Sequence, residues 1–365
     1  MRAVFRVDAS IEIGSGHVIR CLTLAERLGR EGWEIHFICR DLPGCMAEFI
    51  EEKGYRVHLL SRPSGEMAGG SLPGSPVHAG WLGLSWEQDA ADTARALDRI
   101  DSPLNWLLVD HYAIDAGWES RLRSRADRIM VIDDLADRSH DCEVLLDQNL
   151  YQDPVRRYQE RVASDCRLLL GPQYALLREE FVETRRHLGE RDGTVRRVLV
   201  FFGGADQGNM TGMTLDAIEG LQNPAIHVDM VVGSGNPHRE ALEERCKSMK
   251  NVTCHIQINN MAEFMSNADL AIGAAGTSTW ERCSLSLPAL VVSIARNQQP
   301  IAEAVAAAGA VTYLGKAENI NSDSIGRALL EACQHPELLQ NQGRISAGLV
   351  DGAGTERVIR TIAEH

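Results

Sequence analysis

The chain has 365 residues, of which 44% are hydrophobic and 24% charged, and its formal net charge is −14. This length suits two domains of ordinary size. So acidic a chain lacks the basic face that general nucleic-acid binding needs, and we expect no nucleic-acid partner. It can still hold one phosphorylated small molecule, because helix N-termini and backbone N–H groups bind a diphosphate without a basic surface.

Cysteine usage and the N-terminal pattern predict the compartment. The nine cysteines include no C-x-x-C pair, which indicates reduced thiols and argues against a disulfide framework or a zinc site. The chain enters a strand pattern at once, with neither a signal peptide nor an apolar run of about 18 residues. We therefore expect a cytoplasmic, soluble monomer without a membrane partner.

The first half alternates short apolar strands with amphipathic helices, which is typical of a parallel sheet covered by helices. We predict strands at Ala3–Val7, Glu34–Cys39, Val57–Leu60, Trp106–Val109, Ile129–Ile132 and Val144–Leu146. The first helix follows His17, after which apolar residues recur at helical spacing. Residues 61–85 are rich in Gly, Ser and Pro and predict a surface loop, either an ordinary insertion or a lid over the site.

A second α/β series begins at Val198 and predicts a second domain. Its strands are expected at Val198–Phe202, His227–Val232, Val252–His255, Asp269–Ile272, Ala289–Ile294 and Val311–Leu314. The polar run Glu183–Arg197 holds few apolar residues and reads as the boundary. We predict a Rossmann-like domain over 1–182, a linker over 183–197, a second Rossmann-like domain over 198–350, and a C-terminal helix over 351–365 with the option that it crosses back to the first domain.

The junction after the first strand carries the first chemical motif, Asp8 to His17. In parallel α/β sheets ligands bind at this carboxyl edge, so we expect Asp8 to contact the substrate. Gly14, Ser15 and Gly16 let the backbone approach a ligand closely. His17 opens the helix, where the helix dipole favours the neutral imidazole that a general base needs. The alternative is a structural histidine, but the Gly-Ser-Gly-His context favours catalysis.

A later strand of the first domain ends in Asp110-His111-Tyr112. Asp110 or Tyr112 can reach a bound sugar, whereas His111 is expected to be structural. The pair Asp133-Asp134 suggests a metal ion, but neighbouring residues at a strand end point to opposite sides, so we expect no metal.

Three segments of the second domain predict a nucleotide site. The strand ending at Gly204 suits a phosphate turn, and Asn209 beyond it can contact a ligand or cap a helix. At Gly276, Thr277 and Ser278, hydroxyls and free N–H groups can hold a pyrophosphate. Glu281 lies one helical turn further on and can accept two hydrogen bonds from a ribose diol, or serve as a capping acid. The polar cluster Arg296-Asn297-Gln298-Gln299 follows another strand, as part of the site or as a plain polar loop, and we take Asn297 and Gln298 as its candidate contacts.

Several motifs in one order resemble the PseG family of UDP-2,4-diacetamido-2,4,6-trideoxy-β-L-altropyranose hydrolases. They are FRVDASIEIGSGHVIRCL, LLVDHYAID, VIDDLADRSHDCEVLLDQN, LLGPQYALLREEF, VFFGGAD and the segment Gly273–Glu281. The family in turn resembles the MurG glycosyltransferases. The resemblance implies a GT-B fold, a cleft between two Rossmann-like domains, an N-terminal domain that holds the sugar and a C-terminal domain that holds UDP.

The resemblance also implies the reaction. UDP leaves the anomeric carbon with inversion while His17 takes a proton from the attacking water, as a step of pseudaminic acid biosynthesis without a metal or cofactor. Glu281 falls where the family has its ribose contact, and Asn209 and Asn297 are carried over as further contacts. The main alternative is a MurG-like glycosyltransferase with a UDP-amino sugar donor. A UDP-sugar 2-epimerase comes third, and a non-catalytic nucleotide-sugar sensor would keep Glu281 but would not need His17.

Overall fold

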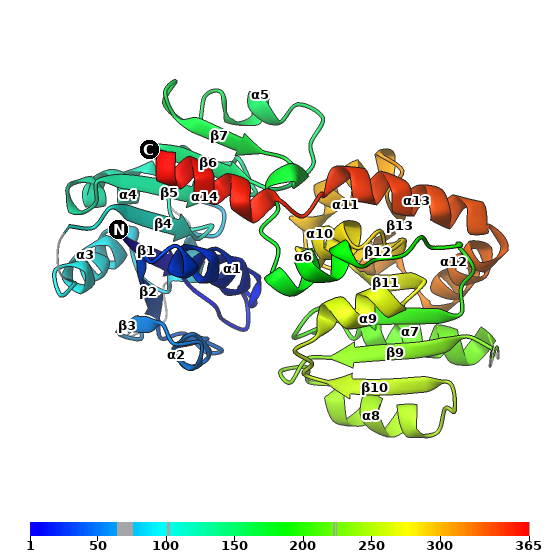
Figure 1. The fold of residues 1–365 in the computed structure, drawn as a ribbon. Coiled ribbons are helices and arrows are strands. Elements are labelled where there is room, and N and C mark those ends of the chain that lie inside the picture. The colour runs from blue at the N-terminus through cyan, green and yellow to red at the C-terminus, as the bar shows by residue number, and fades with distance from the viewer. Residues whose placement is uncertain (64–75, 101–102, 222, 224, 365) are drawn as a thin grey trace. The chain divides into compact units, whose positions relative to one another are not determined.

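The protein divides into two compact units, shown by the computed structural model in Figure 1. The structure describes residues 1–365 except 64–75, 101–102, 222, 224 and 365. Unit 1 consists of Met1–Asn149, Asp153–Leu176 and Thr355–His365, and unit 2 of Leu150–Gln152 and Leu177–Gly354. Among the described residues, no helix is long and apolar enough to cross a membrane.

Unit 1 is built on a parallel sheet of seven strands in the order β3-β2-β1-β4-β5-β6-β7 (Figure 1). The strands are β1 (Arg2–Val7), β2 (Glu34–Arg40), β3 (Arg56–Leu60), β4 (Trp106–Asp110), β5 (Arg128–Ile132), β6 (Val144–Asp147) and β7 (Arg167–Leu170). Most of these strands are buried along their length, because helices cover both faces of the sheet. The strand β7 adds to the six that the sequence predicts.

Helices of unit 1 form two apolar layers on the sheet. The α-helices are α1 (Gly16–Arg30), α2 (Ala47–Glu52), α3 (Trp86–Leu97), α4 (Ala116–Leu122), α5 (Pro154–Tyr158) and α14 (Gly354–Glu364), and the short 3₁₀ turns are η1 (Ala79–Leu82), η2 (Arg123–Arg125) and η3 (Pro172–Tyr174). One cluster joins α1 to α14 through residues such as Leu24 and Val358. The other joins the opposite face to α3 and α4 and includes the fully buried Trp118.

Unit 2 repeats the same design with a parallel sheet of six strands, ordered β10-β9-β8-β11-β12-β13. The strands are β8 (Arg197–Phe201), β9 (His227–Val232), β10 (Val252–Ile256), β11 (Leu270–Ala274), β12 (Ala289–Ser293) and β13 (Thr312–Lys316). Its helices are α6 (Glu179–Arg186), α7 (Met210–Leu221), α8 (Arg239–Lys247), α9 (Met261–Asn267), α10 (Ser278–Ser284), α11 (Gln298–Ala307), α12 (Ser322–Gln334) and α13 (Pro336–Leu349), with the 3₁₀ turn η4 (Ala317–Asn319).

The division between the units differs from the expected linker over 183–197. The polar run lies within the longer segment of unit 2, Leu177–Gly354, and the helix α6 before it and at its start buries Phe181 completely. Arginines then attach the run to unit 2: Arg185 donates to the carbonyls of Ser284 and Ala347, and Arg191 to those of Met265 and Leu285. Polar composition therefore marks a docked segment here. The last helix, α14, groups with unit 1 from Thr355 onwards.

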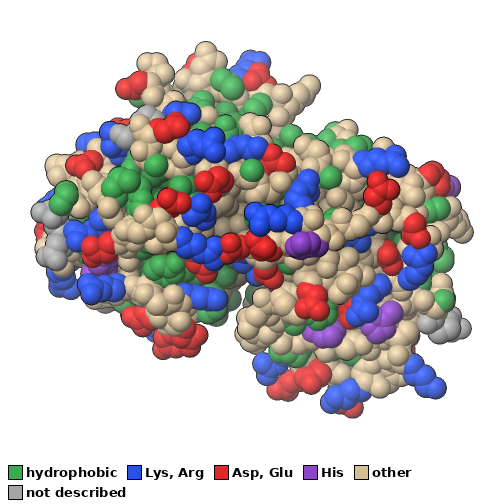
Figure 2. All heavy atoms as spheres, viewed as in Figure 1, with side chains coloured by type: hydrophobic (Ala, Val, Ile, Leu, Met, Phe, Trp, Pro, Cys, Tyr) green, Lys and Arg blue, Asp and Glu red, His purple; other side chains and the backbone are tan. Residues whose placement is uncertain are grey.

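The surface carries charges of both signs. On the face shown in Figure 2, basic and acidic side chains are interspersed, and no large single-sign patch stands out. With a net charge of −14, this distribution suits binding through a few placed groups better than broad electrostatic attraction.

Candidate active site

The switch point of the sheet in unit 1 brings the first two motifs together. The strands β1 and β4 are neighbours, with Val7 paired to Asp110, although more than a hundred residues separate their starts. The loop after β1 and the loop after β4 therefore leave the sheet side by side. Ligands of doubly wound folds bind at this position.

Asp110 pairs with His17 at this switch point. His17 lies in the first turn of α1, and its Nδ1 is 2.6 Å from Oδ1 of Asp110. Both carboxylate oxygens also accept from Arg20, at 2.6 Å from Nε and 2.7 Å from Nη2. Burial alone would raise the pKa of Asp110, but Arg20 and His17 outweigh it and hold that pKa well below its usual range. Asp110 is therefore an ionised acceptor behind the imidazole.

An ionised carboxylate fixes the tautomer of the imidazole. Because Asp110 can only accept, Nδ1 of His17 carries a proton and donates it, which leaves the lone pair on Nε2. Nη2 of Arg20 lies 3.2 Å from the same Nδ1, but both groups donate to the shared Oδ1 of Asp110 at shorter distances. The side chain of His17 is 9% exposed. The imidazole is therefore almost buried, and its Nδ1 side is fixed by Asp110.

Asp134 lies on the other side of Arg20 from Asp110 and pairs with the same guanidinium. Its two oxygens accept from Nη1 of Arg20 at 3.0 and 2.8 Å, and Oδ2 also accepts from the hydroxyl of Tyr112. Asn149 donates to Oδ1 at 2.8 Å. The ring of Tyr112 meets His17 edge-on, with the centroids 4.5 Å apart. Tyr112 thus lies beside His17, with its hydroxyl turned to Asp134.

Asp8 has a structural role that the sequence did not predict. Its oxygens lie 2.6 and 2.9 Å from the guanidinium of Arg6, and Oδ1 accepts from the backbone N–H of Arg40 at 2.7 Å. Burial would raise the pKa of Asp8, but Arg6 and His111 hold it well below the usual range. The expected ligand role for Asp8, and likewise for Asp110, gives way to these internal ion pairs, since both carboxylates are 1% exposed.

The Gly-Ser-Gly segment forms a tight turn before α1. The N–H of Gly14 donates to the carbonyl of Ser10 at 2.8 Å, and Gly14 has φ of 79°, a left-handed conformation that favours glycine. The helix begins at Gly16, with Ser15 as its N-cap, so His17 is the second helical residue. The hydroxyl of Ser15 makes no capping bond. The turn thus delivers His17 to the carboxyl edge of the sheet.

Two aromatic side chains near His17 were missed by sequence reasoning. Trp81 stacks on Tyr112, with the centroids 5.5 Å apart and the planes at 23°, and His78 lies 4.4 Å from Trp81. Both belong to the expected loop 61–85, whose middle part, 64–75, lies outside the described residues. Composition without periodicity gave no signal for them. The expected lid role of that loop stays a hypothesis.

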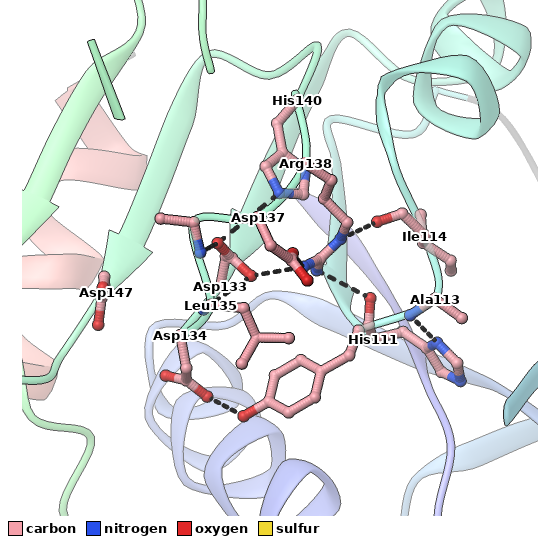
Figure 3. Close-up of polar contacts among 12 residues, drawn as sticks. His111, Ala113, Ile114, Asp133, Asp134, Leu135, Asp137, Arg138, His140 and Asp147 are labelled. Carbon is pink, nitrogen blue, oxygen red and sulfur yellow. Dashed lines mark hydrogen bonds and ion pairs between the residues drawn. The ribbon is translucent and has the colours of Figure 1, made fainter. Parts of the chain in front are cut away.

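Asp133 and Asp134, the two acidic residues after β5 that suggested a metal ion, form ion pairs inside unit 1. Asp133 faces Arg138 at 2.9 Å (Figure 3) and accepts from the backbone of Ala136. Asp134 instead faces Arg20. Burial would raise the pKa of Asp133, but Arg138 and His140 lower it to about 2. Within the described part of the chain, no group of three or more His, Cys, Asp or Glu side chains is arranged to hold a metal.

Unit 2 has its own switch point between β8 and β11, where Phe201 pairs with Gly273. A Cβ at Gly233 would lie 2.1 Å from the carbonyl oxygen of Gly204, so the turn after β8 passes the end of β9 at very close range. Asp206 accepts from the N–H groups of Met210 and Thr211 and starts α7. The turn at Gly204 is therefore built by local capping.

Asn209, expected as a ligand contact or a cap, forms a cap. Its side-chain oxygen accepts from the N–H of Gly212 at 3.2 Å, and its backbone is left-handed with φ of 52°. The side chain of Gln298 lies close to Gly276: a Cβ added to Gly276 would be 3.3 Å from Nε2 of Gln298. The Oε1 of Gln298 accepts from the N–H of Ile294 at 3.1 Å. Asn297 is the N-cap of α11 without a side-chain capping bond.

The turn from Gly273 to Glu281 leads from β11 into α10. Thr277 is its N-cap, without a side-chain capping bond. Ser278 accepts from Nη1 of Arg282 at 3.1 Å, and Arg282 also donates to the carbonyl of Ala274 at 2.8 Å. Burial lowers the pKa of Arg282 to about 10. A buried guanidinium therefore lies directly beneath this turn.

Glu281 forms an ion pair within unit 2 that the sequence did not predict. Its Oε1 accepts from Nη2 of Arg178 at 2.9 Å, and its side chain is 17% exposed. The capping-box alternative is not borne out, because no capping bond to the start of α10 is formed. Arg178 also pairs with Glu180. Any ligand contact of Glu281 shares the carboxylate with Arg178.

The two doubly wound units define the class: the protein has the GT-B fold. The MurG of Acinetobacter baumannii superposes with a TM-score of 0.66 at 13% identity, covering 100% of this chain and 99% of that one. UGT89C1 of Arabidopsis thaliana complexed with UDP also gives a TM-score of 0.66, at 13% identity and 99% coverage of each chain. At these identities the likeness concerns the fold alone.

Comparison of the sequence with known proteins shows which members of this fold class the chain is similar to. Residues 198–354 match the glycosyltransferase family 28 C-terminal domain. The UDP-2,4-diacetamido-2,4,6-trideoxy-β-L-altropyranose hydrolase of Campylobacter jejuni is 25% identical over 311 residues, which are 85% of this chain and 97% of that protein. The spore coat polysaccharide biosynthesis protein SpsG of Bacillus subtilis is 27% identical over 259 residues, 70% of this chain and 75% of that protein. The resemblance to the PseG family is thereby confirmed.

Proposed function

We propose that this protein hydrolyses UDP-2,4-diacetamido-2,4,6-trideoxy-β-L-altropyranose to UDP and the free sugar, with inversion and with His17 as the general base. The observation that carries the proposal is the pair of His17 with the buried, ionised Asp110. Similarity to the Campylobacter hydrolase over 85% of the chain supports the substrate and a role in pseudaminic acid biosynthesis. A cytoplasmic monomer remains our expectation.

The imidazole has the form that base catalysis needs. With the Nδ1 proton donated to Asp110, the Nε2 lone pair of His17 can take a proton from water. Asp110 stays ionised and stabilises the imidazolium that forms, as a carboxylate does in other histidine-based sites. Arg20 bridges Asp110 to Asp134, so the carboxylate cannot swing away from the ring.

The bonds balance without a metal or cofactor. An oxygen–carbon bond forms between water and the anomeric carbon as the bond from that carbon to the UDP oxygen breaks. The water proton goes to Nε2 of His17, and UDP leaves with the electron pair. Hydrogen bonds to the diphosphate stabilise the leaving group as charge develops on it.

We assign UDP to unit 2. Backbone and hydroxyl groups at Gly204, Gly276, Thr277 and Ser278 are the proposed diphosphate contacts, and Glu281 the ribose contact. The match of 198–354 to a glycosyltransferase C-terminal domain supports this assignment. Asn209, Asn297 and Gln298 are proposed as secondary contacts, each in competition with the local hydrogen bonds or helix start described above. In unit 1, Gly14, Ser15, Gly16 and Tyr112 are proposed to border the sugar.

The test is UDP release from a panel of UDP-diacetamido sugars and UDP-N-acetylglucosamine in ¹⁸O-water. We expect release from the diacetamido-altrose derivative, label in the sugar only, and a product anomer of inverted configuration by NMR. Label in the phosphate would mean attack at phosphorus and overturn the proposal. Release that requires an added sugar or lipid-linked acceptor would instead support the MurG-like transferase.

A further inference from the structure

A short aromatic wall stands beside the proposed base. It consists of His78 and Trp81, which no expectation from the sequence singled out. Trp81 lies over Tyr112 at 23° between planes, and His78 lies 5.5 Å from Tyr112 and 4.4 Å from Trp81. His17 meets Trp81 edge-on at 6.5 Å between centroids. Four rings from three segments of unit 1 therefore gather at one place.

The wall is anchored to the body of unit 1. Leu82, the neighbour of Trp81, is 1% exposed within the apolar cluster under α3 and α4. Trp81 itself packs against the same cluster. The turn closes at Gly83, which is left-handed with φ of 71° and donates to the carbonyl of Gly80 at 3.1 Å. Fixed in this way, the rings can offer a preformed surface to a ligand.

His78 and Trp81, which form the wall, are more exposed to solvent than His17 and Tyr112. His17 and Tyr112 are buried at 7% and 4% exposure, whereas His78 and Trp81 keep an intermediate share of their surface in solvent. Burial lowers the pKa of His78 below its usual range, and the charges of Arg138 and His17 lower it further. Asp137 acts in the opposite direction but does not cancel these effects. At neutral pH the wall is therefore an uncharged, partly open aromatic surface at the edge of the His17 site.

We propose that Trp81 and His78 contact the sugar and select for its apolar substituents. The inference rests on the proposed function, because it takes the sugar to lie at His17. A 2,4-diacetamido-2,4,6-trideoxy hexose has an acetamido group at C4 and a methyl as C6, where N-acetylglucosamine has a hydroxyl and a hydroxymethyl group; both sugars have an acetamido group at C2. Apolar groups of that kind pack on aromatic rings. A hydroxylated sugar would lose hydration there without gaining a hydrogen-bond partner.

The test compares Trp81→Leu with the matched control Trp86→Leu, a partly buried tryptophan at the start of α3. In Trp81→Leu we expect KM for the diacetamido substrate to rise by about 10-fold or more, in line with the effect of losing an apolar contact. The value of kcat and the inhibition constant of UDP should stay within about threefold. Preference for the diacetamido substrate over UDP-N-acetylglucosamine should fall by a similar factor. Trp86→Leu should leave this preference unchanged.

His78 gives a second, independent arm. His78→Phe should keep the preference because it keeps the ring, and His78→Ala should lose it. If both variants and Trp81→Leu fold with wild-type melting temperature and retain the substrate preference, the wall does not contact the sugar. A loss of UDP affinity by the same factor as the rise in KM would also overturn the proposal, because it indicates a general structural defect.

Calorimetry with the free diacetamido sugar separates this inference from the proposed reaction. If the wild type releases no UDP but binds the free sugar more tightly than Trp81→Leu does, the wall stands and the hydrolase proposal falls. If the wild type hydrolyses the substrate and Trp81→Leu matches it in every constant, the hydrolase proposal stands and the wall falls. If the wild type neither binds the sugar nor releases UDP, both fall.

Discussion

Nδ1 of His17 lies 2.6 Å from Oδ1 of Asp110, although ninety-three positions separate the two residues in the chain. The contact arises because β4 inserts next to β1 in the sheet, so the first loop after each strand meets the other. The carboxylate orients the imidazole, and the next carboxylate, Asp134, holds the intervening Arg20. Two of the predictions below depend on this arrangement.

Replacing the proposed base should abolish most turnover and leave binding intact. His17→Asn keeps polarity and approximate size but cannot take a proton at neutral pH. We expect kcat to fall by about 10²–10⁴, the usual contribution of general-base catalysis. Substrate affinity should change by less than about 1 kcal/mol, since the residue acts in the transition state. Steady-state rates and calorimetry with the inactive variant measure the two effects.

The outcome for His17→Asn decides between catalysis and structure. A variant within a few-fold of wild type would make His17 a structural residue at the start of α1. Because Asp8 and Asp110 are both engaged in internal ion pairs, a surviving activity would also require a base outside these motifs. His58, a half-buried histidine of β3, supplies the control substitution His58→Asn, which should keep full activity.

Asp110→Asn should be nearly as damaging, for a different reason. An amide can donate to Nδ1, which favours the tautomer with its proton on Nε2 and removes the free lone pair. We expect kcat to fall by about 10²–10⁴ at neutral pH, with partial recovery at higher pH where hydroxide can replace the base. The pH profile is the decisive measurement, because a purely structural loss would lower activity by the same factor at every pH. Asp41→Asn, at the surface, serves as the control.

The fold was readable from the sequence because buried parallel strands appear as apolar runs. Ile129–Ile132, for example, lies within β5, and the Gly-Ser-Gly-His motif located the start of α1. The strand β7 was not predicted because its segment, Arg167–Leu170, is short and only partly buried. The role of Arg20 was not predicted because a polar residue inside an amphipathic helix looks like a surface position.

Long-range pairing explains what the sequence did not reveal in the site. Asp110 was expected to face the sugar, and its role behind His17 follows from the order of strands in the sheet, which no local pattern encodes. Trp81 sits in a segment rich in Gly, Ser and Pro that has no periodicity. Its position on Tyr112 depends on Leu82 reaching the core.

Glu281→Ala should weaken UDP binding by about 1–3 kcal/mol, the cost of losing charge-assisted hydrogen bonds to the ribose. The ion pair with Arg178 orients the carboxylate, so Arg178→Met should weaken binding in the same direction and by less. Isothermal titration calorimetry with UDP measures both. Unchanged UDP affinity in Glu281→Ala would remove the ribose role. Glu263→Ala, another glutamate of unit 2, is the matched control.

Activity should survive chelation. The proposed mechanism moves one proton to His17 and leaves the diphosphate charge to hydrogen-bond donors of unit 2, so it includes no step through a metal. We expect the rate of UDP release to be unchanged after dialysis against EDTA. If EDTA abolished the activity and Mg²⁺ or Mn²⁺ restored it, the proposed mechanism would be wrong and a metal would have to balance the diphosphate.

The paired carboxylates around Tyr158 should make stability depend on pH in opposite directions. The tyrosine hydroxyl lies 3.0 Å from Oδ2 of Asp133 and 2.9 Å from Oδ2 of Asp147. Burial raises the pKa of Asp147 to about 7, and Asp134 adds to the shift. The pKa of Asp133 is about 2, because Arg138 and His140 overcome its burial. An unfolded aspartate titrates near about 3.9.

The signs follow from linkage. Between about pH 4 and pH 7 the folded protein keeps the Asp147 proton that the unfolded chain releases, so this residue makes the free energy of unfolding fall as pH rises. Asp147→Asn cannot ionise and should remove that fall, so its free energy of unfolding should rise relative to that of the wild type from about pH 4 to about pH 7.

Asp133 contributes stability above about pH 4 that is lost as pH falls towards about 2. Asp133→Asn should therefore be less stable than the wild type at neutral pH and approach it in acid. Urea unfolding at several pH values measures both differences. A constant difference between Asp147→Asn and wild type across this range would show that Asp147 is ionised in the folded protein and that the argument from burial is wrong.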